Sequence, residues 1–258
     1  MEKIIRKTLL YKTGVEYGDY CINHVLGCSH GCLYPCYAYL LKKRTGAVEN
    51  YSDWTNPKIV GNAMELLEKE VARHKDKIKT VHLCFSTDPF MYGQDEIQDL
   101  SIDIMDYLNR AGISCTVLTK GIYPVTKINS SFFIYDPGKI NSYGITLVSI
   151  NEDFRKKYEP GAAGIEDRIL SLKQLHDLGY KTWVSMEPYP TPNIIEQDLL
   201  PILKRVGFVD KIIFGKMNYN PVATSFVGSR EFYKNKANII IDFCNKNKIK
   251  CYVKEGTV

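Results

Sequence analysis

The chain has 258 residues, of which 45% are hydrophobic and 24% are charged, and its formal net charge is +5. This is the composition of a globular protein able to bury one sizeable core, so we expect a single domain over 1–258. No apolar run approaches the roughly 20 residues that span a bilayer, and the N-terminus lacks a signal-peptide pattern. We therefore expect a cytoplasmic protein without membrane contact. The mild positive charge fits a nucleic-acid or phosphate partner, or simply lysine-rich surfaces.

Short apolar runs alternate with helical patterns along the chain. Seven runs have the apolar, often β-branched character of buried parallel strands: 19–27, 80–86, 114–120, 142–150, 180–187, 209–215 and 249–255. Helical spacing of apolar residues is found between them, at 57–74, 95–109, 164–178, 193–206 and 230–246. Pro57 would occupy the first turn of the first of these helices.

Alternation of strand and helix predicts parallel strands joined by right-handed crossovers. About six such units predict a single-domain α/β fold, a partial (β/α)6 TIM-like barrel with its core at about 18–215. Segment 216–258 would add a C-terminal helix and strand on the substrate side. An open Rossmann-like sheet is the alternative, although no predicted strand is followed by GxGxxG. In both arrangements, functional side chains belong at the C-terminal ends of the strands.

Three of the eight cysteines, Cys28, Cys32 and Cys36, lie together just after the first predicted strand. Thiolates are the natural ligands of iron–sulfur centres. A zinc site normally takes four protein ligands, so a zinc interpretation would require His30 or a distant cysteine as the fourth. Three thiolates on a [4Fe–4S] cluster leave one iron open to an exogenous ligand, which suits catalysis.

The cysteine loop, N-x-x-x-G-C-S-H-G-C-L-Y-…-C-Y-A from Asn23, resembles the cluster loop of radical S-adenosylmethionine (SAM) enzymes. The resemblance is to the branch around spore photoproduct lyase, and it continues through 82–90, 118–120, 149–151 and 159–162 to Arg168 and about residue 190. The family usually has CxxxCxxC, whereas Pro35 lengthens the last interval here. We expect the loop to bulge at Pro35 and keep all three thiolates on iron.

The resemblance implies a barrel of the radical SAM type with a [4Fe–4S] cluster and SAM as cofactors. In such enzymes the open iron binds the methionyl amine and carboxylate of SAM, and reductive cleavage yields a 5′-deoxyadenosyl radical that abstracts hydrogen from the substrate. An external electron donor of the flavodoxin or ferredoxin type is also implied. The stretches TGVEYGDY, LYPCYA, DPFMYG and VLTKG are similar to radical SAM mobile pair proteins, which implies a second radical SAM protein as partner.

Polar side chains at predicted strand ends are the expected SAM contacts. Lys120 would pair with the methionyl carboxylate, and the resemblance implies the same role; a surface lysine is the alternative. Ser86, Ser149 and Asn151 would donate to the carboxylate or the ribose, or else bind their own backbone.

Further cofactor contacts are expected from one arginine and from acidic and aromatic residues. By resemblance, Arg168 would point inward near the methionine moiety, whereas an ion pair with Glu159 or with Asp167 is the structural alternative. Aromatic rings at the barrel mouth could stack on adenine or on a substrate base, and carboxylates at strand ends could contact substrate or ribose. These residues are Tyr34, Tyr37, Asp88 and Glu187. For the carboxylate of Glu187, a helix N-cap or a local salt bridge is the alternative.

Cys84 stands two residues before Ser86. In spore photoproduct lyase, a cysteine two residues before a cofactor-contacting serine returns a hydrogen atom to the product. The resemblance therefore implies a catalytic role for Cys84, with a buried strand thiol as the alternative.

Two functions of different class follow. The first is a radical SAM enzyme acting on an unidentified substrate; the second is a non-catalytic iron–sulfur or zinc protein with a structural or regulatory role. Polar groups converging at strand ends favour the enzyme. The branch resemblance and the positive charge suggest a nucleic acid or a nucleotide as substrate, but no dense Arg/Lys stripe is found, and a peptide or a small metabolite remains open. The loop 216–230 is expected to shape the substrate mouth.

Overall fold

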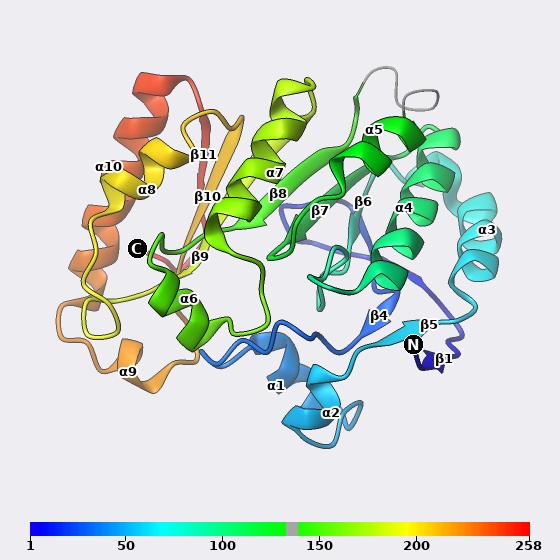
Figure 1. The fold of residues 1–258 in the computed structure, drawn as a ribbon, viewed down its shortest axis with the longest axis horizontal. Helices are drawn as coiled ribbons and strands as arrows, with labels where there is room; N and C mark the ends of the chain where they lie inside the picture. The colour runs from blue at the N-terminus through cyan, green and yellow to red at the C-terminus, as the bar shows by residue number, and fades with distance from the viewer. Residues whose placement is uncertain (133–138) are drawn as a thin grey trace.

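The computed structural model describes residues 1–132 and 139–258, and these form an α/β fold around one large sheet (Figure 1). The sheet has eight strands in the order β11-β10-β9-β8-β7-β6-β3-β2. The strands are β2 (Leu10–Lys12), β3 (Tyr20–Ile22), β6 (Thr80–Leu83), β7 (Ser114–Thr119), β8 (Ser142–Thr146), β9 (Lys181–Tyr189), β10 (Lys211–Lys216) and β11 (Lys250–Val253). Neighbouring strands are parallel except β2 and β3.

The sheet is not closed, because β2 and β11 form its two edges. Each of the seven predicted apolar runs coincides with one of its parallel strands to within a few residues at each end. The predicted partial barrel of parallel strands is therefore confirmed. Within the described ranges, no helix combines the length and the apolar character that a membrane crossing requires.

A second, three-stranded sheet was not predicted. Its strands, in the order β1-β5-β4, are β1 (Lys3–Ile4), β5 (Lys58–Val60) and β4 (Val25–Leu26). The prediction of one strand over 19–27 is therefore wrong, because β3 and β4 belong to different sheets. The predicted helix at 57–74 is also wrong at its start: Ile59 and Val60 are β-branched, buried and paired in β5, and the helix begins only at Ala63.

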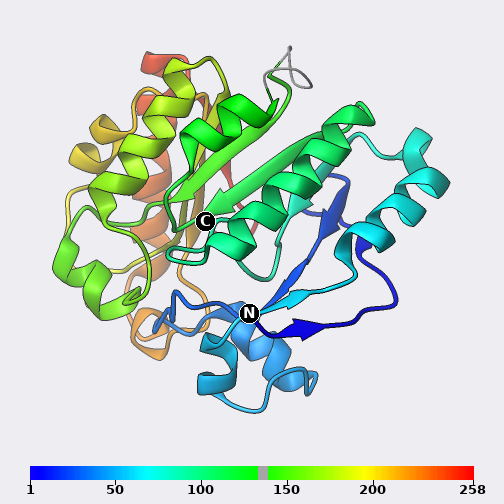
Figure 2. The same cartoon turned by 45° about the vertical axis from the view of Figure 1, so that its right-hand side comes forward.

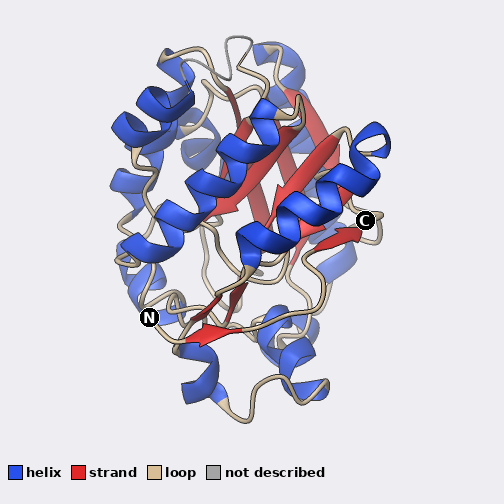
Figure 3. Ribbon diagram, turned by 90° about the vertical axis from the view of Figure 1, so that its right-hand side faces the viewer, coloured by secondary structure: helices blue, strands red, loops and turns tan. Residues whose placement is uncertain are grey.

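The helices form two groups. Six lie along one face of the large sheet (Figures 1 and 3): α3 (Ala63–His74), α4 (Asp95–Arg110), α5 (Val125–Phe132), α7 (Ile165–Asp177), α8 (Leu199–Arg205) and α10 (Ser229–Asn247). The others lie toward one end of the molecule (Figures 1 and 2): α1 (Tyr37–Arg44), α2 (Tyr51–Thr55), α6 (Glu152–Tyr158) and α9 (Pro221–Thr224). A 3₁₀ turn at Lys75–Lys77 follows α3.

The predicted helix at 193–206 is shorter in the structure. Its N-terminal part forms turns, and α8 begins only after Asp198, whose side chain accepts a hydrogen bond from the Leu200 N–H at 3.1 Å. The predicted helices at 95–109, 164–178 and 230–246 agree with α4, α7 and α10 to within a residue or two at each end.

The two faces of the large sheet have different partners. The face toward the helices carries apolar strand residues that join the main core, such as Val81, Val117 and Val184. On the other face, the ring of Tyr17 packs 4.9 Å from His82 and 5.1 Å from Trp183. The loop between β2 and β3 thereby fills part of the barrel interior, and the remaining space opens at the C-terminal ends of the strands.

Candidate active site

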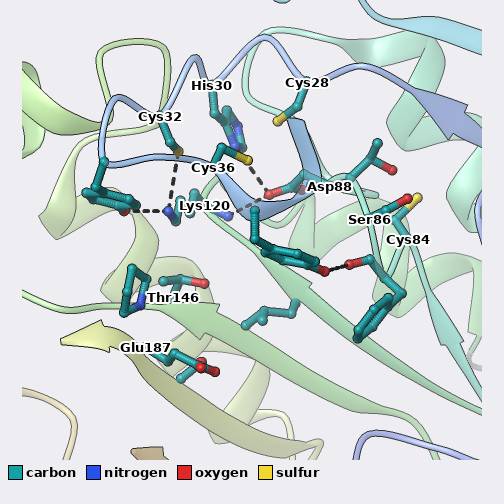
Figure 4. Close-up of a pocket in the computed structure, with 18 of the residues that line it drawn as sticks. Cys28, His30, Cys32, Cys36, Cys84, Ser86, Asp88, Lys120, Thr146 and Glu187 are labelled. Carbon is teal, nitrogen blue, oxygen red and sulfur yellow. Dashed lines mark hydrogen bonds and ion pairs between the residues drawn. The ribbon is translucent and has the colours of Figure 1, made fainter. Parts of the chain in front are cut away.

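A cavity of about 390 Å³ lies at the C-terminal ends of the strands (Figure 4). The side chains of Cys28, Cys32 and Cys36 line it together with residues that follow β6, β7 and β10 and with Glu187 of β9. In Figure 4 the cysteines lie on one side of the cavity and Glu187 on the opposite side. The structure therefore brings together the cysteine loop and several of the strand-end residues that the sequence predicted.

The cysteine loop is held by backbone contacts on both sides. The Cys28 N–H donates to the Trp54 carbonyl at 2.7 Å, and the Leu33 N–H donates to the Tyr158 carbonyl at 2.8 Å. Gly27 has a φ of 90°, and a Cβ there would lie 2.7 Å from the same Trp54 carbonyl oxygen, so the turn into the loop requires glycine. These contacts fix the loop without using the thiols, which leaves the thiols facing the cavity.

The three thiols are half-buried and unpaired with one another as disulfides. Burial raises the pKa of the Cys32 thiol to about 11, although the Lys120 ammonium, 3.4 Å away, acts in the opposite direction. Within the described residues, no group of three or more His, Cys, Asp and Glu side chains meets at a position for a single metal ion. Three thiols around one cavity, with a cation beside them, fit a multi-iron cluster, in which each thiolate binds its own iron.

His30 is fully engaged by other residues. Its Nε2 accepts a hydrogen bond from the Tyr92 N–H at 3.0 Å, and its Nδ1 lies 3.3 Å from a carboxylate oxygen of Asp88. Burial lowers the pKa of His30, which favours the neutral ring with Nδ1–H directed to Asp88. His30 is therefore not free to act as the fourth ligand of a zinc site in this arrangement.

Lys120 stands at the centre of a buried polar cluster. Its ammonium lies 2.6 Å from the Tyr34 hydroxyl and 2.9 Å from a carboxylate oxygen of Glu159, and Tyr34 also donates to Glu159. The other oxygen of Glu159 lies 2.8 Å from the Arg168 guanidinium. Burial alone would raise the pKa of Glu159, but Lys120 and Arg168 outweigh burial and lower it to about 2.

Arg168 lies behind this cluster, outside the cavity lining. Its side chain is 1% exposed, and it donates to the Ala163 carbonyl at 2.9 Å and to the Thr146 carbonyl at 3.2 Å. The structural ion pair with Glu159, weighed above as the alternative role, is present. Glu159 also contacts Lys120 and Tyr34, which the sequence did not predict.

The carboxylate of Asp88 fixes the ends of β6 and β7 relative to each other. It accepts hydrogen bonds from the Thr119 hydroxyl at 2.7 Å, the Lys120 N–H at 2.8 Å and the Phe90 N–H at 2.9 Å. Asp88 lines the cavity and at the same time positions Lys120.

The predicted serine and asparagine contacts divide into two groups. Ser86 lines the cavity, and its hydroxyl donates to the Asn23 side chain at 2.9 Å. Ser149 and Asn151 are not part of the cavity lining. The Ser149 hydroxyl accepts from the Asn151 N–H at 3.1 Å, and the Asn151 side chain caps α6 by accepting from the Phe154 N–H at 2.9 Å. The backbone-binding alternative therefore describes the contacts of these two residues.

The remaining predicted residues lie at the rim and in the far wall of the cavity. Tyr37, which is 43% exposed, donates to the Phe85 carbonyl at 2.6 Å. Cys84 is 3% exposed, lines the cavity and places its Sγ 3.5 Å from Nδ1 of His24. Glu187 pairs with Lys254 at 2.8 Å.

Lys254 was not predicted. It bridges Glu187 to Glu16 of the β2–β3 loop, with its ammonium 3.2 Å from the Glu16 carboxylate. The contact with Glu16 links the end of β11 to the β2–β3 loop across the open side of the barrel. The position of Lys254 near the C-terminal end of the last predicted strand, 249–255, is a signal of the same kind as that of Lys120. Tyr17, which also lines the cavity, carried no such signal, because it lies in an irregular loop.

Gly215 in β10 makes room for Glu187, and we expect Gly215→Ala to destabilise the fold by about 1–3 kcal/mol. A Cβ at Gly215 would lie 2.7 Å from Cδ and 2.8 Å from Cγ of Glu187, so the carboxylate would move away from Lys254. Urea unfolding measures the effect. Gly14→Ala is the control, because a Cβ at Gly14 meets nothing within 4 Å; equal stability of both variants would contradict the prediction.

Comparisons with known proteins agree with this site. A family model described as the radical SAM superfamily matches residues 22–206. The chain is 23% identical over 199 residues to the uncharacterized protein MJ0683 of Methanocaldococcus jannaschii, covering 77% of this chain and 70% of that protein. A structure of spore photoproduct lyase complexed with dinucleoside spore photoproduct has a TM-score of 0.65 at 12% identity, covering 97% of this chain and 80% of that chain. Streptococcus suis SuiB bound to S-adenosylmethionine has a TM-score of 0.52 at 10% identity, covering 72% and 40%.

Proposed function

Because this chain belongs to the radical SAM superfamily, it is a radical SAM enzyme, and we propose that Cys28, Cys32 and Cys36 hold its [4Fe–4S] cluster. Enzymes of this superfamily use that cluster together with SAM. The observation that supports the ligand assignment is that all three thiols of one loop line a single cavity at the strand ends. Lys120, beside Cys32, supplies a cation on the same side.

When bound, the reduced cluster and SAM supply a 5′-deoxyadenosyl radical that abstracts hydrogen from the substrate. The residues of the chain bind and orient. Lys120 binds the methionyl carboxylate, and Glu159 holds the Lys120 ammonium in place from behind. Other direct contacts to SAM come from the predicted residues that line the cavity: Tyr34, Tyr37, Ser86, Asp88 and Glu187. Three more act at a distance, by positioning the α6–α7 region: Ser149, Asn151 and Arg168.

Anaerobic purification and reconstitution test this proposal. We expect about four irons per chain, an EPR signal of the reduced protein that changes when SAM is added, and release of 5′-deoxyadenosine. A non-catalytic iron–sulfur or zinc protein would show no response to SAM. Iron held by four side chains, or zinc alone in anaerobically prepared protein, would contradict the proposal.

For the substrate, we propose a nucleic acid or a nucleotide. Spore photoproduct lyase, which shares the fold, binds a dinucleoside photoproduct. In this chain, the exposed rings of Tyr37 and Tyr219, 43% and 66% accessible, both line the cavity. Exposed aromatic rings stack on bases without regard to sequence. The net charge of +5 also favours an anionic substrate.

The proposed partners follow from the family. The cluster needs an electron from an external donor of the flavodoxin or ferredoxin type, and a second radical SAM protein is the further partner that we propose. A cytoplasmic location would keep the thiols reduced before the cluster is inserted. Co-purification of tagged chain with a second iron–sulfur protein from the source cells would test the pairing.

We propose Cys84 as a hydrogen-atom donor to the substrate radical. Its S–H bond breaks, a C–H bond forms on the substrate, and the thiyl radical left on Sγ regains an electron from the external donor and a proton from solvent. Burial raises the pKa of Cys84 to about 12, so the thiol keeps its hydrogen at neutral pH. Its Sγ also borders the cavity, where a substrate radical would form.

Cys84→Ala is expected to cleave SAM at an unchanged rate. In D₂O, its product should contain at least about tenfold less deuterium than the wild-type product, because the hydrogen of a thiol exchanges with solvent before it is donated. Nucleosides from treated cellular nucleic acid are analysed by mass spectrometry. Cys115→Ala is the control, since Cys115 is equally buried but belongs to the core facing the helices. Undiminished deuterium uptake by Cys84→Ala would rule out the donor role.

A further inference from the structure

Three lysine side chains line the cavity, and two of them form ion pairs with carboxylates. Lys120 pairs with Glu159 at 2.9 Å, and Lys254 pairs with Glu187 at 2.8 Å. The ammonium of Lys216 makes no ion pair or hydrogen bond with residues 1–132 or 139–258, although it lines the same cavity. Because Lys120 is assigned to the methionyl carboxylate of SAM and Lys254 bridges two carboxylates, Lys216 is the remaining one of these three cations for an anionic substrate.

The backbone at Lys216 is held by buried contacts. The pairing register of β10 with β9 shifts between Phe214 and Lys216, an irregularity of the kind that re-aims a side chain next to a functional site. Tyr233 of α10 connects the ends of β9 and β10 beside this irregularity. Its hydroxyl donates to the Tyr189 carbonyl at 2.8 Å and accepts from the Met217 N–H at 3.0 Å. Tyr233 is itself buried, so a packed scaffold sets the direction of Lys216.

The backbone of Lys216 adjoins the wall of the cavity that contains Glu187. The residue before it, Gly215, packs so closely on Glu187 that a Cβ there would lie 2.7 Å from its Cδ. Figure 4 places Glu187 across the cavity from the three labelled cysteines. A ligand on Lys216 would therefore leave the cysteine side free for the cluster and SAM.

An exposed aromatic ring stands close to Lys216 in the chain. Tyr219 lines the cavity, is 66% exposed and has a φ of 61°, a conformation that L side chains rarely adopt. The next residue stabilises the turn, because the Asn220 side chain accepts hydrogen bonds from the N–H groups of Val222 at 2.9 Å and Ala223 at 3.1 Å. Such strained residues persist where the surrounding structure holds them, and they concentrate at ligand-binding sites.

We propose that Lys216 binds a phosphate group of the substrate and that Tyr219 stacks on the adjoining base. A lysine binds phosphate as a point charge, and an aromatic ring beside it can stack on a base. These two contacts together are how proteins bind single-stranded nucleic acids. This inference rests on the nucleic-acid or nucleotide substrate proposed above and names the residues that would recognise it.

The test uses the 258-residue chain with its cluster reconstituted and SAM bound. Fluorescence anisotropy of labelled DNA and RNA tetranucleotides of mixed sequence gives the dissociation constant at several salt concentrations. Lys216→Ala is expected to weaken binding about tenfold and to reduce the slope of log K against log salt by about 0.7, the loss of one single-strand phosphate contact. The oligonucleotide dissociation constant of Lys216→Arg should stay within about threefold of the wild-type value, because this variant keeps the charge.

The matched control is Lys250→Ala, which removes the same charge from an exposed position at the N-terminal end of β11, away from the cavity. It should bind oligonucleotides as the wild type does. The SAM dissociation constant, measured by anaerobic calorimetry, should be the same in every variant. A loss of SAM affinity in Lys216→Ala would assign this lysine to the cofactor and overturn the inference, as would unchanged oligonucleotide binding in that variant.

Inorganic pyrophosphate separates this inference from the proposed substrate class. If the wild type binds no oligonucleotide, but pyrophosphate raises its melting temperature and not that of Lys216→Ala, the phosphate site stands and the nucleic-acid substrate fails. If Lys216→Ala changes neither the binding of oligonucleotides nor the effect of pyrophosphate on the melting temperature, the phosphate site itself is overturned.

Discussion

Replacing Cys28, Cys32 and Cys36 together with alanine is expected to reduce bound iron from about four per chain to near zero and to abolish 5′-deoxyadenosine release. Without thiolates the cavity has no soft ligands for iron. The chain should still fold, because the loop is held through the Cys28 N–H and the Leu33 N–H rather than through sulfur. Iron and sulfide analysis after anaerobic reconstitution, with circular dichroism for folding, checks both expectations.

Cys251→Ala is the control for this experiment. Cys251 is also a half-buried free thiol, but it lies in β11 and does not line the cavity. It should keep its full iron content and SAM cleavage. Retention of a SAM-responsive cluster by the triple variant would show that other residues ligate iron and would remove the basis of the proposed function.

Glu159→Gln is expected to destabilise the protein by about 3 kcal/mol at neutral pH and to weaken SAM binding at least about tenfold. The amide leaves the buried ammonium of Lys120 and the buried guanidinium of Arg168 without a counter-charge. The Lys120 ammonium then also loses the group that orients it. Anaerobic urea unfolding, followed by the fluorescence of the buried Trp54 and Trp183, and calorimetry with SAM measure the two effects.

The difference in stability between the wild type and Glu159→Gln is expected to depend on pH in a defined direction. The pKa of Glu159 is lowered from 4.5 to about 2, so its stabilisation is fully present above about pH 4.5 and is lost as the pH falls toward 2. The stability gap between wild type and Glu159→Gln should therefore narrow over that interval.

Glu166→Gln provides the matched surface control. Glu166 pairs with Arg205 where both side chains are largely exposed, 66% and 47%, so this variant should cost less than about 1 kcal/mol at any pH. Equal destabilisation by the two variants would argue that Glu159 is no more than an ordinary ion-pair partner.

The strand positions of the large sheet could be predicted from the sequence because burial on both faces makes parallel strands nearly continuously apolar. Strands as short as β1 and β5 lack such a run, and they form only because distant segments pair with them. The predicted helix start at Pro57 failed for this reason. Pairing of Ile59 and Val60 with residues far away in the chain overrode the local helical spacing.

What the sequence by itself determined was local: the spacing of Cys28, Cys32 and Cys36, and the placement of Lys120 at a strand end. Only the tertiary structure decided which charges meet. Glu159 reaches Lys120 from 39 positions away, and Lys254 reaches Glu187 of β9 from 67 positions away. Coulomb attraction depends on distance in space and on burial, not on separation along the chain, so no local pattern could show that Lys120 and Lys254 form ion pairs while Lys216 forms none with residues 1–132 or 139–258.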